Sequence, residues 1–417
     1  MEKAPEELYQ EREKRVSDAI QLKVPDRVPI APFVGFFPAK YAGITCEEAM
    51  YDYSKAYAAW KKTFLDFQWD MIIPPRYAYT GPTFEALDYK QLKWPGHGVK
   101  PNYSYQFVEG EYMKADEYDA FLEDPSDFMI RTYLPRICGI LEPFKRLPPI
   151  HQTFAYYLGL LSTLGAIGTP EVITAIESLL KAARECVKWS AALGPFFREM
   201  REAGFPMMYG SGSQAPFDTI GDFLRGTHGI MTDMYRRPDK LLKAIDKVTP
   251  WMIQMAVSAA KATGNPRVLI PLHKGSEYFM SLEQFKTFYW PSLRKVILAL
   301  IDEGLTPYLL LEGKWGSERL EVISDIPKGK AIYHFETVDI HEAKEILGKV
   351  ACIKGNVPNS LLVTGTPQEV KDYCKKLIDV VGKDGGLIMD AGAPIDEAKP
   401  ENLKAMTDFT KEYGVYR

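Results

Sequence analysis

Eight short apolar runs, separated by stretches with the spacing of amphipathic helices, are the feature that most constrains the fold of this chain. The runs lie at residues 28–34, 70–75, 206–210, 267–273, 306–312, 330–336, 350–356 and 385–392. Strands that alternate with helices form parallel sheets with crossover helices. Eight such units favour a closed (β/α)8 barrel, the TIM-barrel type of α/β fold, over an open doubly wound sheet.

The spacing of these runs is uneven and predicts an insertion. About 130 residues separate the second run from the third, whereas the later runs follow one another closely. Within the gap, residues 172–193 have a clear helical period, and the rest is rich in Tyr, Pro and Gly. We therefore predict a single domain over residues 1–417, with a helical and irregular insertion at about 80–200 that covers one end of the barrel.

The composition excludes several classes of protein. A net charge of −4 leaves no basic field for nucleic acid, and no apolar run approaches the roughly 18 residues of a membrane span. The acidic first residues do not resemble a signal peptide, so we expect a cytoplasmic protein without nucleic-acid or membrane partners. The five cysteines are widely spread and form no C-x-x-C pair, so we expect reduced thiols.

Polar residues follow five of the predicted strands: His273, Glu312, Glu336, Asn356 and Asp390. The chemistry of such barrels takes place at the carboxyl ends of the strands. Burying a carboxylate costs several kcal/mol unless it is paired, protonated or bound to a metal, so acids that converge there should raise one another's pKa or share a cation. We predict that Glu312, Glu336 and His273 are catalytic.

Simpler interpretations remain for the same residues. Each acid could cap the following helix or pair with Lys314, Lys328 or Arg319 at the rim. His273 could be an imidazole hydrogen-bonded to the backbone. The glycine-rich stretch 210–241 matches neither a phosphate-binding loop nor a dinucleotide fingerprint, so a nucleotide site is not expected.

Aromatic side chains follow the first and second strands. We predict that Phe33, Phe36, Phe37 and Tyr77 line a pocket for a flat or apolar substrate, with Asn356 also contacting it. The alternative is an ordinary hydrophobic rim.

The chain resembles the uroporphyrinogen decarboxylase superfamily, which includes corrinoid-dependent methyltransferases. The resemblance rests on "KVPDRVPIAPF", "APFDTIGDFLRGTHGIMTDMYRRPDKL", "IKGNVPNSLLVTGTPQEVKDYCKKLI" and "KPENLKAMTDFTKEYG". It implies the same barrel over most of the chain.

Two departures narrow the resemblance. Decarboxylases of the family carry an Arg-rich segment at the first strand and an aspartate after the second, where this chain has "VGFFPAKYAG" and "PPRYAYTG". Coenzyme M methyltransferases bind zinc through thiolates after strands five and eight, where this chain has "EGK" and "DAGAPID". The chain is most similar to the branch that demethylates aryl methyl ethers, whose metal site uses carboxylate and imidazole.

This branch implies that Glu312, Glu336, His273 and Asp390 supply zinc ligands, or that one of the acids is a proton donor at the ether oxygen. The methyl acceptor would be the Co(I) corrinoid of a partner protein, since this chain has no D-x-H-x-x-G corrinoid signature. A homodimer is also possible. The alternative functions are a uroporphyrinogen-decarboxylase-like lyase and a non-catalytic barrel that binds a small molecule.

Overall fold

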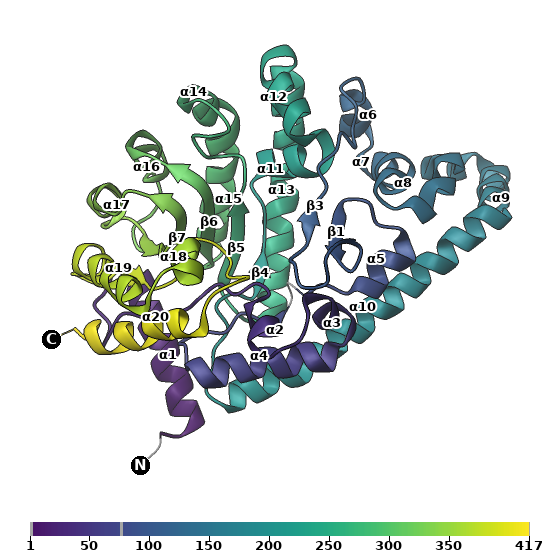
Figure 1. The fold of residues 1–417 in the computed structure, drawn as a ribbon. Coiled ribbons are helices and arrows are strands. Elements are labelled where there is room, and N and C mark those ends of the chain that lie inside the picture. The colour runs from purple at the N-terminus through teal and green to yellow at the C-terminus, as the bar shows by residue number, and fades with distance from the viewer. Residues whose placement is uncertain (1–2, 76–77, 417) are drawn as a thin grey trace.

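A sheet of six parallel strands forms the centre of the computed structural model, which describes residues 3–75 and 78–416 (Figure 1). The strands pair in chain order from β4 to β9. Their bounds are β4 Ser211–Gly212, β5 Arg267–Leu272, β6 Thr306–Trp315, β7 Ile332–Val338, β8 Cys352–Lys354 and β9 Leu387–Ile388. The carboxyl ends of all six strands therefore meet at one end of the sheet.

The first two predicted strands close this sheet into a barrel without forming regular ladders. Ile30 bridges Met389, just after β9, and the N–H of Asp70 donates to the carbonyl of Ile30 at 2.8 Å. Ile72 in turn bridges Met207, just before β4. Eight parallel segments thus complete a ring, and the predicted (β/α)8 barrel is confirmed.

Strand β6 continues beyond residue 312, where the sequence predicted its end. Its pairing with β7 shifts between Leu311 and Lys314, which gives β6 one extra residue and makes a β-bulge. Gly313 at the bulge has a φ of 78°, a conformation that is accessible to glycine at little cost. Glu312 therefore sits at an irregularity of the strand and not at its end.

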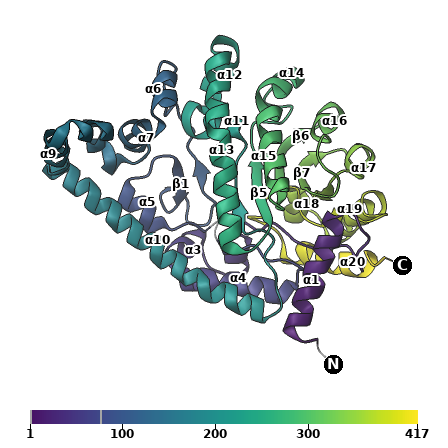
Figure 2. The same cartoon turned by 180° about the vertical axis from the view of Figure 1, so that it is seen from behind.

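Helices surround the barrel and connect its strands (Figures 1 and 2). Thr366, the N-cap of α19, forms a capping box with Glu369. The helices of the barrel are α1 Pro5–Ile20, α2 Phe37–Tyr41, α3 Cys46–Tyr51, α4 Tyr53–Phe67, α11 Pro216–Ile220, η5 Gly221–Arg225, α12 Gly226–Arg236, α13 Pro238–Thr263, α14 Leu282–Gln284, η6 Phe285–Tyr289, α15 Trp290–Asp302, α16 Ser317–Ile323, α17 Ile340–Leu347, α18 Asn359–Thr364, α19 Pro367–Val380 and α20 Pro400–Tyr413.

The insertion after the second strand contains a small sheet of its own as well as helices. In that sheet β1 pairs in parallel with β2 and antiparallel with β3. The long helix α10 leads away from the barrel, and α9 lies at its far end (Figure 1). The elements are α5 Gly81–Leu87, β1 Leu92–Pro95, β2 Gly98–Val99, β3 Gln106–Phe107, α6 Tyr118–Glu123, α7 Pro125–Phe128, η2 Met129–Tyr133, α8 Leu134–Ile137, η3 Gly139–Arg146, η4 Ile150–Phe154, α9 Tyr156–Ile167 and α10 Pro170–Glu202.

Within the described residues, no single helix has both the length and the apolar character needed to cross a membrane. Helices α9 and α10 meet both criteria only as a pair, with a bend of 75° at the break between them.

Candidate active site

His273 follows β5 directly and is held by a carboxylate from a neighbouring loop. Its Nδ1 lies 2.6 Å from Oδ2 of Asp222, in the π-helical turn η5. Burial alone would lower the pKa of His273, but the hydrogen bond to Asp222 and the charges of Asp218 and Asp222 raise it to about 9. The imidazole is therefore protonated at neutral pH, and its side chain remains 35% exposed.

Asp218 fixes the backbone beneath this pair. Its carboxylate accepts hydrogen bonds from the N–H of His273 at 2.9 Å, the N–H of Lys274 at 3.1 Å and the hydroxyl of Tyr289 at 2.7 Å. Burial and the charge of Asp222 raise the pKa of Asp218 to about 6. Asp218 lies in α11 and Asp222 in η5, which follows it directly, so one continuous helical segment positions both the backbone and the ring of His273.

Lys274 ties the insertion to this end of the barrel. Its Nζ lies 2.8 Å from Oδ1 of Asp222 and 3.0 Å from Oε1 of Glu109, which follows β3. The side chain of Lys274 passes over Gly221. A Cβ added at Gly221 would lie 2.9 Å from both Cδ and Cε of Lys274, so the lysine needs a glycine there. Although burial raises the pKa of Asp222, the bond from His273 and the charge of Lys274 hold it below its ordinary value. The site thus pairs an ionised Asp222 with two cations.

Glu312 faces the other nitrogen of the imidazole. Its Oε1 lies 3.9 Å from Nε2 of His273. Burial raises the pKa of Glu312; the charges of Glu336 and Asp222 add to this shift, while His273 opposes it. The structure thus brings the predicted residues His273 and Glu312 together.

Glu336 is close to Glu312 but is exposed. Its Oε2 accepts a 2.6 Å hydrogen bond from the N–H of Gly313, at the bulge of β6. Glu336 therefore supports the backbone next to Glu312, and it does not line the cavity described below.

Asp390 is separated from this group and lies inside the barrel. Its carboxylate pairs with Nζ of Lys354 and accepts hydrogen bonds from the N–H groups of Phe33 and Ala391. Asp390 and Lys354 are both fully buried. Because its oxygens are bound to these partners, the prediction that Asp390 joins the metal ligands is corrected.

The predicted ligands do not fit a zinc ion in this arrangement. His273 and Glu312 present one donor atom each to a common space, while Glu336 binds the backbone and Asp390 binds Lys354. Across the described ranges, no three His, Cys, Asp or Glu side chains are grouped as a metal site would require. The side chains of this site therefore have to act without a metal ion.

A cavity of about 730 Å³ opens at His273 and Glu312. Its walls come from the first barrel strand, from the carboxyl ends of β5 and β6, and from the insertion. Seven of its described lining residues are aromatic: Phe33, Tyr79, Phe84, Tyr89, Tyr105, Phe107 and Phe223. The polar lining residues are Glu109, Gln214, Asp222, His273, Lys274 and Glu312. The cavity joins an aromatic wall to a cluster of acid–base groups.

Of the residues predicted to contact the substrate, some line this cavity and others lie elsewhere. Phe33 lines the cavity, as predicted. Phe36 and Phe37 are buried in the core, where Phe36 packs edge-on against Tyr105, so they support the wall without forming it. Asn356 is buried, and its Oδ1 accepts a 3.1 Å hydrogen bond from Tyr373. Tyr77 lies outside the described residues.

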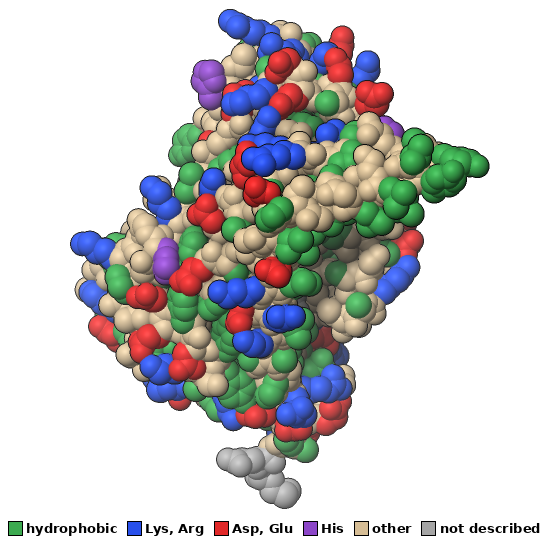
Figure 3. Space-filling view, turned by 90° about the vertical axis from the view of Figure 1, so that its right-hand side faces the viewer, with side chains coloured by type: hydrophobic (Ala, Val, Ile, Leu, Met, Phe, Trp, Pro, Cys, Tyr) green, Lys and Arg blue, Asp and Glu red, His purple; other side chains and the backbone are tan. Residues whose placement is uncertain are grey.

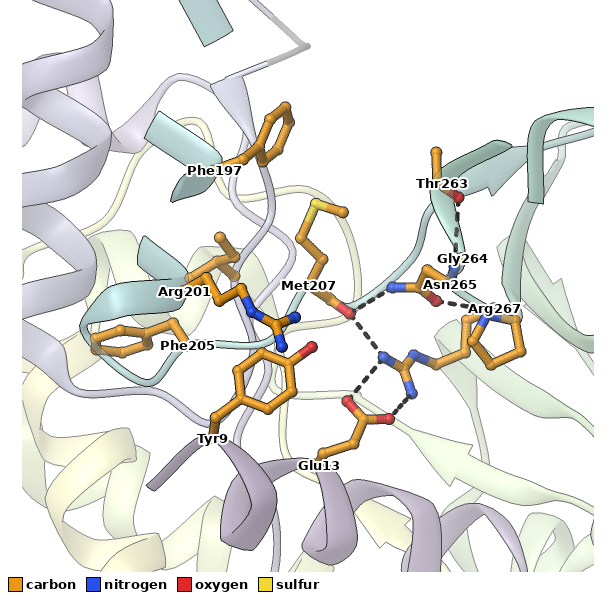
Figure 4. Close-up of a pocket in the computed structure, with 12 residues that line it drawn as sticks. Tyr9, Glu13, Phe197, Arg201, Phe205, Met207, Thr263, Gly264, Asn265 and Arg267 are labelled. Carbon is orange, nitrogen blue, oxygen red and sulfur yellow. Dashed lines mark hydrogen bonds and ion pairs between the residues drawn. The ribbon is translucent and has the colours of Figure 1, made fainter. Parts of the chain in front are cut away.

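A second cavity, of about 360 Å³, lies at the opposite end of the strands (Figure 4). Arg267, the first residue of β5, binds both carboxylate oxygens of Glu13 there, and Arg201 stacks over Tyr9. In this fold the amino-terminal end of the barrel contributes to stability, and chemistry is expected at the carboxyl end. The cavity at His273 is therefore the candidate active site.

Sequence reasoning missed Asp218, Asp222, Lys274 and Glu109. The spacing D-x-x-x-D in "FDTIGDF", directly after the third strand, was the available signal for the two aspartates. No local pattern pointed to Glu109, because it reaches Lys274 through the fold of the insertion.

Comparisons with known proteins agree with this architecture. A methyltransferase from Methanosarcina mazei superposes with a TM-score of 0.62 at 16% identity, covering 96% of this chain and 98% of that chain. At this identity the likeness shows the fold. The uroporphyrinogen decarboxylases of Chlorobium phaeovibrioides and Chlorobium luteolum are each 33% identical over 79 residues, which is 18% of this chain. The matched part spans 22% of the length of each of these relatives.

The uroporphyrinogen decarboxylase (URO-D) family matches residues 199–413. This range holds β4 to β9 together with Asp218, Asp222, His273 and Glu312. More than half of the chain is matched, and the chain therefore belongs to the uroporphyrinogen decarboxylase (URO-D) family.

Proposed function

We propose that this chain is the methyltransferase component of an O-demethylating system, which takes the methyl group of a methoxylated aromatic compound and passes it to the Co(I) corrinoid of a partner protein. The observation that carries the proposal is the protonated His273, fixed by Asp222 at 2.6 Å, on the wall of an aromatic cavity. The likeness to a methyltransferase fold agrees with it.

The aromatic lining favours a planar substrate. Aromatic rings pack favourably against one another in offset stacks or edge to face, and the cavity volume lies within the usual range for small-molecule sites. Apart from His273, the positive charge among the described lining residues is that of Lys274, which is already paired with Asp222 and Glu109. A substrate with many carboxylates would find few free cations there.

His273 is suited to protonate the leaving oxygen. When the carbon–oxygen bond of the methoxy group breaks, both electrons remain on the aryl oxygen, and the proton on Nε2 of His273 neutralises it. A pKa of about 9 is close to that of a phenol, which favours proton transfer in the transition state. The bound corrinoid of the partner would supply the nucleophile that accepts the methyl group.

Glu312 and Asp222 keep the imidazole protonated and correctly oriented. Asp222 holds Nδ1 and leaves Nε2 to face the cavity, while Glu312 stabilises the positive charge from the side of Nε2. Solvent or Glu312 then returns the proton to His273. The reaction as a whole consumes one ether and one proton and yields one phenol and one transferred methyl group.

The test is a methyl-transfer assay with a reduced corrinoid protein and a panel of methoxybenzoates, followed through the cobalamin spectrum. Spectral conversion that depends on the methoxylated compound and is lost in His273→Gln would support the proposal. Absence of transfer with every corrinoid protein and every ether tested would count against it.

Family membership makes decarboxylation the second candidate. A tetrapyrrole or small aromatic acid would then release carbon dioxide, and His273 would protonate the carbanion that remains. Incubation with uroporphyrinogen, with product analysis by chromatography, separates the two functions, because only a decarboxylase shortens the acid side chains.

A further inference from the structure

Helix α9 is almost entirely apolar on its surface and is barely covered by its own chain. Only Gly159 and Thr163 of its residues are buried. We define the α9 patch as Phe154, Tyr156, Tyr157, Leu158, Leu160, Leu161 and Leu164, all of which are exposed. Phe154 is 92% exposed and Tyr156 is 75% exposed. Figure 3 shows hydrophobic side chains gathered on the projecting part of this face.

This patch is too large for a surface that meets only water. With aromatic side chains at 150–250 Å² each, its exposed apolar area is on the order of 1,000 Å². The largest patch on a typical monomer is about 300–600 Å². A stable interface between two proteins buries about 800 Å² on each partner. The area of the α9 patch therefore matches one side of a dimer interface.

The neighbouring helix α10 carries features that fit a second copy of the same helix. Ile173, Leu180 and Val187 are exposed and lie seven residues apart, so they form a stripe along one side. Exposed acids, Glu171 and Glu177, come first along the helix, and exposed bases, Lys181, Arg184 and Lys188, come after them.

We propose that two copies of this chain associate through the α9 patch and the first half of α10, with the two α10 helices antiparallel about a twofold axis. An antiparallel arrangement places Glu177 of each helix opposite Lys181 of the other, and a twofold axis makes each such contact twice. The α9 patch of each subunit is then covered by the α9–α10 arm of its partner.

The charge pattern favours this occupant over a lipid surface. Helices that lie on membranes carry rows of Lys and Arg beside their apolar face. Here α9 has no charged residue, and the exposed part of α10 that follows carries acids as well as bases. A mixed pattern of this kind complements itself but does not attract anionic lipid.

Sedimentation velocity of the full-length chain over a wide dilution range tests the proposal. We expect a species of twice the 47.3 kDa mass of one chain that dissociates on dilution. Leu161→Glu should raise the dissociation constant by at least about tenfold, since it buries an unpaired charge at the interface. Met255→Glu, at an exposed apolar residue of α13, is the matched control and should not change it.

A charge exchange gives a second, independent measurement. Glu177→Lys and Lys181→Glu should each weaken the dimer, and the double variant should restore it, because each pair re-forms across the twofold axis. A monomer at every concentration, a dimer unaffected by Leu161→Glu, or flotation with phosphatidylcholine–phosphatidylglycerol vesicles that Leu161→Glu abolishes would each overturn the proposal. Thermal unfolding of every variant checks that its fold is intact.

Discussion

Nδ1 of His273 and Oδ2 of Asp222 are joined by a 2.6 Å hydrogen bond that fixes both the direction and the charge of the imidazole. The carboxylate keeps the ring protonated through neutral pH, although the side chain is largely surrounded by protein. Because Nδ1 is bound to Asp222, the other ring nitrogen, Nε2, faces Glu312 and the aromatic cavity. In the proposed reaction, this nitrogen is the proton donor to the leaving oxygen.

The first prediction concerns the pH dependence of methyl transfer. The protonated form of His273 exists below its pKa, so activity should be constant near neutral pH and fall as the pH rises through about 9. In Asp222→Asn the ring loses the negative charge that raises its pKa, and the amide oxygen is a weaker acceptor than the carboxylate, so this limb should move toward the ordinary value of about 6.5. The pH profile of kcat, measured for the wild type and for Asp222→Asn, gives the position of this limb in each protein. An unchanged profile in Asp222→Asn would rule out His273 as the proton donor.

The second prediction separates the two glutamates. Glu312→Gln should lower kcat by about 10²–10³-fold, because Glu312 lines the cavity and faces the imidazole. Glu336→Gln should lower it only several-fold, since Glu336 is exposed and acts through the N–H of Gly313. Single-turnover rates at matched substrate concentrations measure the difference. Equal losses in both variants would show that the two carboxylates act on the same atom.

The third prediction concerns the aromatic wall. Phe107→Ala removes a lining ring that packs at 5.9 Å from Phe223, and it should raise KM for a methoxybenzoate about three- to tenfold with a smaller effect on kcat. Tyr103→Ala is the control, because Tyr103 is 57% exposed and does not line the cavity. If Phe107→Ala binds the substrate as tightly as the wild type does, the substrate occupies a different part of the molecule.

The fourth prediction is that methyl transfer does not require zinc. We expect dialysis against a strong chelator to leave the rate of methyl transfer unchanged, because the side chains at the site supply the proton without a Lewis acid. The metal content of the protein before and after dialysis is measured in the same samples. Loss of activity that zinc restores would return Glu312 and His273 to the role of ligands.

The fold was predictable to a large extent because each apolar run is a local signal. The runs at 267–273, 306–312 and 330–336 became regular strands, whereas those at 28–34 and 70–75 pair only through isolated bridges. The two irregular runs hold two prolines each, Pro29 and Pro32 in the first and Pro74 and Pro75 in the second, whereas β5 and β6 hold one each. Since proline has no N–H to donate, the irregular runs have fewer donors for a ladder. The small sheet of the insertion had no comparable signal in its sequence.

The site was predictable where a strand alone positions the residue. His273 and Glu312 follow apolar runs and do meet at one end of the barrel. Asp390 also follows such a run, but its side chain meets Lys354 inside the barrel, and a strand pattern does not show which interior residue will be its partner. Asp222 depends on a π-helical turn, which sequence periodicity does not show.

The last prediction concerns the buried pair of Lys354 and Asp390. Both side chains are fully buried, and Lys354→Met would leave the carboxylate of Asp390 without its cation. Breaking a buried ion pair from one side costs about 3–5 kcal/mol, so the free energy of unfolding in urea should fall by that amount. Lys404→Met, which removes an exposed lysine paired with Asp408 on α20, should change it by less than about 1 kcal/mol. Equal stability of the two variants would mean that water or a protonated Asp390 replaces the ion pair, whereas a selective loss in Lys354→Met would show that this pair stabilises the barrel core.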